Sequence, residues 1–194
     1  MSNNESFMYF SLIQCAMARV EAKYILLEVA GGNPKHRERV YCYELYHQMR
    51  CLQEQCDLQN KFTINGEIDK RGPQEVDEDC NPDFVMHTPG NMENNGCVVE
   101  VKVRTNNGSD LPSKRGVHKD LKTITCMLHC YQYQYGALVF VDITEEEIAP
   151  ILQEADIAHL KDISDRVVIF FQSKDNPCNI SCKSLKEILE GEKQ

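Results

Sequence analysis

The first part of the chain carries two apolar stripes at the spacing of an α-helix. The members of the first stripe recur at steps of three and four residues: Phe10, Ile13, Met17, Val20, Tyr24 and Leu27. This spacing is that of one helix face, and Gly31, Gly32 and Pro34 supply a stop, so we expect one long helix within residues 1–33. The second stripe, which predicts another amphipathic helix, comprises Tyr41, Leu45, Met49, Leu52 and Cys56.

Strand-like patterns follow. Phe62 to Ile64 predicts a short strand that leads through Asn65 and Gly66 into a surface connection. Residues 82–87 and 97–103 are two further strand-like runs, and the segment between them is rich in Gly, Asn and Pro. These two runs predict an antiparallel hairpin.

The last third of the chain alternates between helical and strand patterns. The members of a third helical stripe are Val117, Leu121, Ile124, Leu128, Tyr131 and Tyr135. We expect Gly136 to end this helix, and a strand over 137–143 to follow. Thr144 to Glu147 is a capping-box signature for another helix, which Pro150 should kink or split. A strand over 166–172 and a helix capped by Ser184 complete an α/β chain.

Composition narrows the class of protein. A chain of 194 residues with 42% hydrophobic content suits one domain over 1–194. The net charge of −9 and the pI near 5.2 argue against non-specific coating of nucleic acid, although a local basic surface remains compatible with them. Ten cysteines without a secretory signal indicate mostly free thiols in a reducing cytoplasm. The apolar start is interrupted by charges, so we expect no signal peptide, membrane span or membrane partner.

Candidate chemistry lies in the predicted hairpin. Strand periodicity places Glu100 and Lys102 on one face. If His87 pairs with Gly96, the register puts Asp83 opposite Glu100, about 5 Å away. Two carboxylates that close repel each other unless a proton or cation intervenes, and hard oxygen ligands favour Mg²⁺ or Mn²⁺. The alternative is an ordinary surface ion pair on a solvated strand.

Pro82-Asp83 and Glu100-Val101-Lys102, in that order on neighbouring strands, resemble the motif of the PD-(D/E)XK nuclease superfamily. Glu44, on the flank of the second helix, resembles the extra acidic residue that many members carry. The resemblance covers about residues 38–143 and implies a restriction-endonuclease-like αβββαβ core. A mixed central sheet would be flanked by helices, with residues 1–33 as an added helix and 144–194 as a helix-strand-helix extension.

The resemblance implies hydrolysis of phosphodiester bonds in nucleic acid, with DNA as the expected substrate and Mg²⁺ or Mn²⁺ as cofactor. Asp83, Glu100, the Val101 carbonyl and Glu44 would hold the metal, and Lys102 would orient the attacking water. Whether Lys102 also accepts a proton stays open. A homodimer or a partner subunit would supply specificity.

Three further features have two interpretations each. Basic residues outnumber acidic ones between Lys102 and Lys122, and this segment is either a groove for a nucleic-acid backbone or a solvated loop. Its candidate contacts are Arg104, Lys114, Arg115, Lys119 and Lys122. Glu67 and Asp69 either support the acidic cluster or lie on a solvated strand face. His87 either contacts substrate or is structural.

Two other functional classes remain as alternatives. A non-catalytic binding or assembly subunit with the same fold is compatible with the acidic charge. A cysteine-based redox or metal-sensing protein is suggested by two C-x3-C pairs, Cys126/Cys130 and Cys178/Cys182. No partner pair at zinc-type spacing follows them, so buried small hydrophobes are the simpler interpretation of most cysteines.

Overall fold

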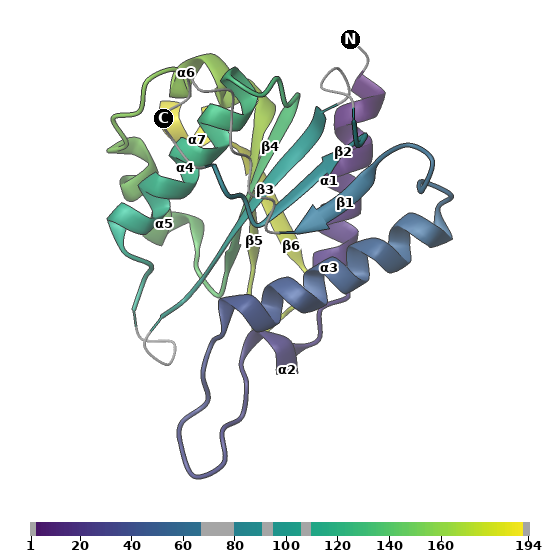
Figure 1. The fold of residues 1–194 in the computed structure, drawn as a ribbon. Helices are drawn as coiled ribbons and strands as arrows, with labels where there is room; N and C mark the ends of the chain where they lie inside the picture. The colour runs from purple at the N-terminus through teal and green to yellow at the C-terminus, as the bar shows by residue number, and fades with distance from the viewer. Residues whose placement is uncertain (1–2, 67–79, 91–94, 106–109, 192–194) are drawn as a thin grey trace.

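A computed structural model describes residues 3–66, 80–90, 95–105 and 110–191. The predicted strand residues Glu67 and Asp69 lie outside this part of the chain. The fold is mixed α and β, with one six-stranded sheet flanked by helices (Figure 1). The helices are α1 (Asn3–Met17), α2 (Ala22–Ile25), α3 (Glu38–Gln55), α4 (Lys114–His129), α5 (Glu145–Gln153), α6 (Leu160–Ile163) and α7 (Leu185–Glu190).

The sheet has the spatial order β1-β2-β3-β4-β5-β6. Its strands are β1 (Thr63–Gly66), β2 (Phe84–His87), β3 (Asn95–Val103), β4 (Tyr135–Val141), β5 (Val167–Gln172) and β6 (Ile180–Ser184). The three central strands, β3, β4 and β5, are parallel, and the other neighbours are antiparallel. Helix α4 connects β3 to β4, as a parallel pair requires a crossover between its strands.

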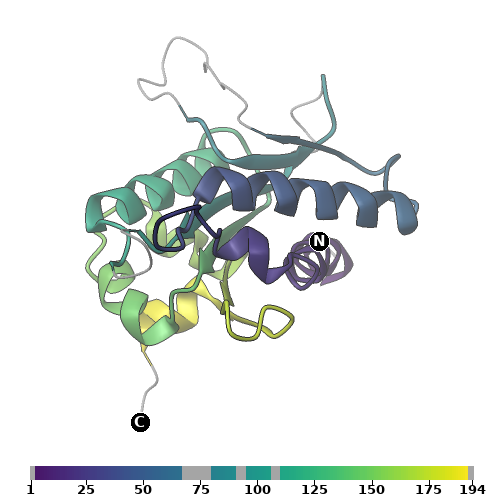
Figure 2. The ribbon, with the colours of Figure 1, turned by 90° about the horizontal axis from the view of Figure 1, so that it is seen from below.

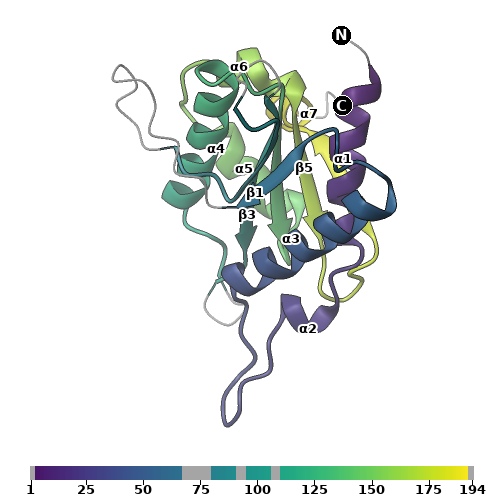
Figure 3. The same ribbon diagram turned by 45° about the vertical axis from the view of Figure 1, so that its right-hand side comes forward.

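Helices cover both faces of the sheet. Helices α1 and α3 pack together on one side, and α4 and α5 lie on the other (Figure 3). Seen from below, α3 runs across α1, which is viewed nearly end-on (Figure 2). Strand β3 serves both cores, because Val99 and Val101 join the α1/α3 core while Val98 joins the α4 core. A central strand with both faces covered reads as a nearly continuous apolar run, so the charges of Glu100 and Lys102 interrupt a buried strand.

The predicted hairpin is confirmed, with the expected register over most of its length. Phe84 lies opposite Val99, and Met86 lies opposite Cys97. His87 pairs with Asn95 instead of Gly96, because the register shifts between Met86 and His87. A bulge of this kind changes the pairing locally, and the register on the Asp83 side of the bulge is unaffected.

Two predicted helix limits are wrong. The first helix ends at Met17, and the short helix α2 follows, so the apolar stripe is divided between two elements. After α2 the chain turns into a small antiparallel bridge between Leu27 and Lys35, with hydrogen bonds in both directions. These backbone pairings compete with continuation of a helix.

The third helix ends at His129, and Gly136 belongs to β4 instead of a helix stop. The reason for glycine here is packing. A Cβ atom at position 136 would stand 2.7 Å from Cγ2 of Ile124 and 3.2 Å from Cγ2 of Val167. Gly136 therefore lets α4 lie close to β4.

The C-terminal part differs from the prediction by added elements. The expected capping boxes of Thr144 and Ser184 are both present. Helix α5 continues through Pro150 to Gln153, so the predicted split does not occur; burial of Ile148 and Leu152 holds the helix on the sheet. Strand β6 and helix α6 were not predicted, and the partial exposure of β6 reflects its place at the sheet edge. Of the helices that the structure describes, none is long and apolar enough to cross a membrane.

Candidate functional site: a carboxylate cluster around Lys102

Asp83 lies where β2 begins and β3 continues past it. Strand β2 pairs with β3 only up to Phe84, which lies opposite Val99. One residue further along the same register, Asp83 faces Glu100. The backbone amide of Val101 donates a hydrogen bond of 2.7 Å to Oδ2 of Asp83, so the carboxylate satisfies a backbone donor that has lost its strand partner. This bond fixes the Asp83 side chain against β3.

Glu100 is a buried acid in the centre of the sheet. It is 4% exposed. Burial, followed by the nearby charges of Asp83 and Asp120, raises the pKa of Glu100 well above its ordinary value, and its carboxyl group is hydrogen-bonded to Asp83. Two carboxyl groups in contact can share one proton in this way. Of these two acids, Glu100 is therefore the one in which burial favours the protonated form.

Lys102 is the cation that pairs with these acids. Its Nζ lies 2.8 Å from Oδ2 of Asp120 and 3.5 Å from Oε2 of Glu38. The same ammonium donates to the Val101 carbonyl at 3.3 Å. Burial alone would lower the pKa of Lys102, but the charges of Asp120 and Glu38 outweigh it and hold the pKa above its ordinary value. Lys102 is therefore charged at neutral pH.

The acidic residue that helix α3 supplies to this cluster is Glu38. Its pKa is raised by burial and by Asp83, while Lys102 acts in the opposite direction. The predicted residue, Glu44, is half-buried and accepts a hydrogen bond of 2.7 Å from Gln48 on its own helix. Glu38 precedes Tyr41 by three residues and Leu45 by seven, so it lies on the buried face of the helix. This spacing from Tyr41 and Leu45 could have identified Glu38 from the sequence as the acid on the buried face.

Asp120 is a further member that the motif did not indicate. It lies on α4 and is 5% exposed. Burial raises its pKa to about 6, although the ion pair with Lys102 acts against this rise. Asp120 follows the buried Val117 by three residues and precedes Ile124 by four. A charged residue on the inner side of an amphipathic helix was therefore visible in the pattern.

The oxygen atoms of this cluster could bind a divalent cation if the protonated carboxyl groups lose their protons. Four carboxyl groups surround one ammonium: Glu38, Asp83, Glu100 and Asp120. Within the described residues no three His, Cys, Asp or Glu side chains form a ready-made metal-binding group. Asp83, Glu100 and the Val101 carbonyl nevertheless present oxygen donors side by side. A cation there would replace the shared proton and relieve the repulsion between two buried carboxylates.

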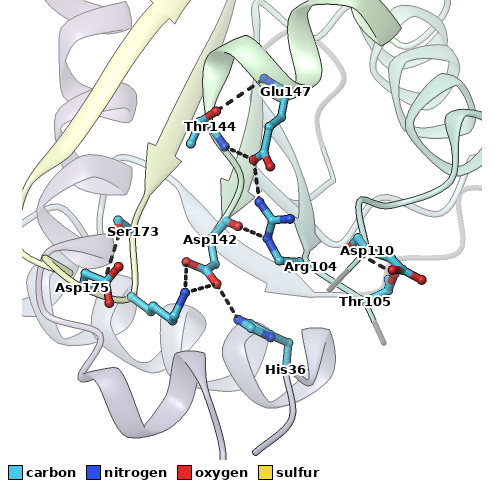
Figure 4. Close-up of polar contacts among 10 residues, drawn as sticks. His36, Arg104, Thr105, Asp110, Asp142, Thr144, Glu147, Ser173 and Asp175 are labelled. Atoms are coloured by element: carbon cyan, nitrogen blue, oxygen red, sulfur yellow. Dashed lines mark hydrogen bonds and ion pairs between the residues drawn. The ribbon is translucent and has the colours of Figure 1, made fainter. Parts of the chain in front are cut away.

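The predicted basic surface is only partly available. Arg104 is bound within the protein: its Nε donates to the Asp142 carbonyl at 2.5 Å, and its guanidinium forms an ion pair with Glu147 (Figure 4). Lys114 is paired with Glu154. Arg115, Lys119 and Lys122 are exposed. The nucleic-acid role of these five residues stays a prediction, with Arg104 the least accessible.

We expect Arg104→Ala to lower the free energy of unfolding by about 1–3 kcal/mol, because the Asp142 carbonyl and the Glu147 carboxylate lose their partner. Lys119→Ala, an exposed change on α4, should stay within about 0.5 kcal/mol of wild type. Urea unfolding of both variants measures the difference. If Arg104→Ala is as stable as wild type, the contacts of Arg104 with Asp142 and Glu147 do not hold it, and Arg104 is accessible to a ligand.

The remaining candidates make local contacts. His87 lies 3.0 Å from Oδ1 of Asn65 on the neighbouring strand β1. All ten cysteines are free. The sulfur atoms of Cys126 and Cys80 are 2.8 Å apart. Cys130, Cys178 and Cys182 are exposed. The cysteines do not enter the cluster around Lys102, except that Cys42 on α3 lies near it, with a pKa raised mainly by burial.

A scan against models of protein families, a search among curated proteins and a search among solved structures each found no match for this chain.

Proposed function

We propose that the protein is a metal-dependent nuclease of the PD-(D/E)XK type, with its active site in the cluster around Lys102. One observation carries the proposal: Asp83, just before β2, accepts from the Val101 amide on β3 and acts on the pKa of the neighbouring Glu100, and the Lys102 ammonium donates to the Val101 carbonyl. Two acids, a carbonyl and a lysine at one point are the groups that metal-assisted phosphodiester hydrolysis requires.

The order of elements supports the same proposal. Helix α3 is followed by β1, β2 and β3, then by α4 and β4. This is the αβββαβ order that the resemblance implied for residues 38–143. Strands β5 and β6 and helices α5 to α7 extend the sheet beyond that core. Glu38 takes the role that the resemblance suggested for Glu44, because Glu38 is the acid of α3 that contacts Lys102.

Each residue has a distinct part in the proposed reaction. Asp83, Glu100 and the Val101 carbonyl would hold a divalent cation, and Glu38 would add negative charge beside them. A bound Mg²⁺ or Mn²⁺ lowers the pKa of water and neutralises charge that develops on the phosphate. Lys102 positions the attacking water and stabilises the same developing charge. Asp120 holds the Lys102 ammonium in place from the opposite side.

The test is cleavage of labelled single-stranded and duplex DNA and RNA by the purified protein with Mn²⁺ or Mg²⁺. We expect cleavage of at least one substrate and its complete loss when EDTA removes the metal. A folded protein that cleaves none of these substrates with either metal would contradict the proposal, and it would favour a non-catalytic binding subunit with the same fold.

A further inference from the structure

A cleft of about 560 Å³ adjoins the carboxylate cluster, between α3 and the adjoining ends of β1 and β2. Its lining includes Asp83 and Glu38, so it opens directly beside the proposed active site. The remaining lining residues are Arg39, Cys42, Tyr43, Tyr46, Gly66 and Phe84. The volume is in the range of pockets that hold small organic groups.

Three aromatic side chains, Tyr43, Tyr46 and Phe84, also line the cleft. Tyr46 and Phe84 are stacked, with ring centroids 6.2 Å apart and an angle of 19° between the ring planes. Tyr43 is 65% exposed and is one of three large hydrophobic side chains that the described part of the chain leaves exposed. Tyr43 and Tyr46 are three residues apart on one helix and are therefore neighbours on its surface. Tyr43 lies outside the buried stripe of α3, whereas Tyr46 is half-buried and packs against the core.

Positive charge lies on the same face. Arg39 precedes Tyr43 by four residues, so both side chains project from one side of α3, and Arg39 is exposed in the cleft lining. The cleft thus combines flat rings, one guanidinium and, at one end, the acids Glu38 and Asp83. A nucleotide has the matching pair of features, namely a planar base beside an anionic phosphate. Stacking of bases on aromatic side chains is the common way in which proteins bind unpaired nucleotides.

We propose that this cleft binds an unpaired nucleobase of the substrate, next to the phosphate that is cleaved. Within a duplex the faces of each base are covered by its neighbours, so a base can reach Tyr43 only from a single strand, an overhang or a flipped-out position. The nuclease therefore acts on nucleic acid that contains unpaired nucleotides. This inference rests on the proposed function for the position of the phosphate, whereas the base-binding step is independent of hydrolysis.

The experiment measures binding without cleavage, by fluorescence anisotropy of short labelled oligonucleotides with Ca²⁺ in place of Mg²⁺. We expect single-stranded oligonucleotide to bind more tightly than the blunt duplex of the same sequence. Tyr43→Ala should weaken single-strand binding by roughly ten- to a hundredfold, the effect of losing one base–ring stack. Tyr43→Phe keeps the ring and should bind as wild type does.

Phe7→Ala is the matched control, since Phe7 is an exposed ring on α1, 73% exposed and outside the cleft. It should leave affinity unchanged. An abasic oligonucleotide should bind wild type as weakly as the normal strand binds Tyr43→Ala, and Tyr43→Ala should cause no additional loss with the abasic strand. Equal binding of normal and abasic strands, no effect of Tyr43→Ala, or no binding of any oligonucleotide would overturn the inference.

The outcomes separate the inference from the proposed function. Suppose that binding depends on the base and on Tyr43, but that the protein cleaves nothing with Mn²⁺. This result would support the base-binding site and contradict the proposed nuclease activity. Suppose instead that cleavage depends on Asp83, but that Tyr43→Ala binds single strands as tightly as wild type does. This result would support the nuclease activity and contradict the base-binding site.

Discussion

Replacement of Lys102 by methionine is expected to slow Mn²⁺-supported cleavage by about a hundred- to a thousandfold, the effect of losing one group that stabilises developing charge. The Lys102 ammonium is held by Asp120 and Glu38 beside the Val101 carbonyl, so this substitution removes the cation that is paired with these acids. The measurement is the single-turnover rate at saturating Mn²⁺. A rate within threefold of wild type would remove Lys102 from the reaction.

Lys102→Met also has a predicted effect on stability. Removal of one partner from a buried ion pair costs about 3–5 kcal/mol, because Asp120 and Glu38 would be left without a counter-charge. Circular dichroism and thermal unfolding in the presence of Mn²⁺ show whether the variant is folded under assay conditions. Lys102→Arg keeps a positive charge with a different shape, so it should recover stability more than it recovers the cleavage rate.

Without metal, the protein is expected to lose stability as the pH rises. Burial raises the pKa of Asp120 to about 6 and that of Glu100 well above its ordinary value. Between the ordinary pKa and the raised one, the folded state binds more protons than the unfolded chain, so an increase in pH favours unfolding. For Asp120 this window lies between about 4 and about 6, and its contribution to the loss is about 2–3 kcal/mol. Glu100 extends the loss toward higher pH.

The measurement is urea unfolding in EDTA at pH 5 and pH 7.5. Glu100→Gln keeps the shape of the protonated acid without its ionisation, so at pH 7.5 this variant should be more stable than wild type and should depend less on pH. Mn²⁺ should stabilise wild type at pH 7.5, since it replaces the proton that Glu100 and Asp83 share, and it should stabilise Glu100→Gln less. The same dependence on pH in wild type and in Glu100→Gln would contradict the raised pKa of Glu100.

The part of the site that the sequence predicted is the part that strand geometry determines. Side chains of a strand alternate between two faces, so Glu100 and Lys102 had to share one. The antiparallel register then placed Asp83 against Glu100, and the bulge at His87 did not disturb that pairing because it lies at the other end of β2. The core elements over 38–143 followed from apolar periodicity in the same way.

The residues that were missed come from helices that pack across the sheet. Glu38 and Asp120 reach Lys102 from α3 and α4, and their convergence depends on how each helix is placed on the sheet. Sequence spacing fixes the face on which a helix residue lies, but it does not fix the neighbouring element that the residue meets. Arg104 shows the converse, since a residue in a basic segment proved to be bound by Asp142 and Glu147. Local charge does not reveal such pairing.

The central claim is that Asp83 and its neighbours cleave phosphodiester bonds with a divalent metal. Its most direct test compares wild type with Asp83→Ala and Glu44→Ala, each confirmed as folded, on one labelled oligonucleotide with Mn²⁺. We expect cleavage by wild type, the loss of detectable cleavage in Asp83→Ala, and nearly full activity in Glu44→Ala, whose carboxylate is bound by Gln48 on its own helix. Equal cleavage by wild type and Asp83→Ala, or none by wild type, would contradict the claim.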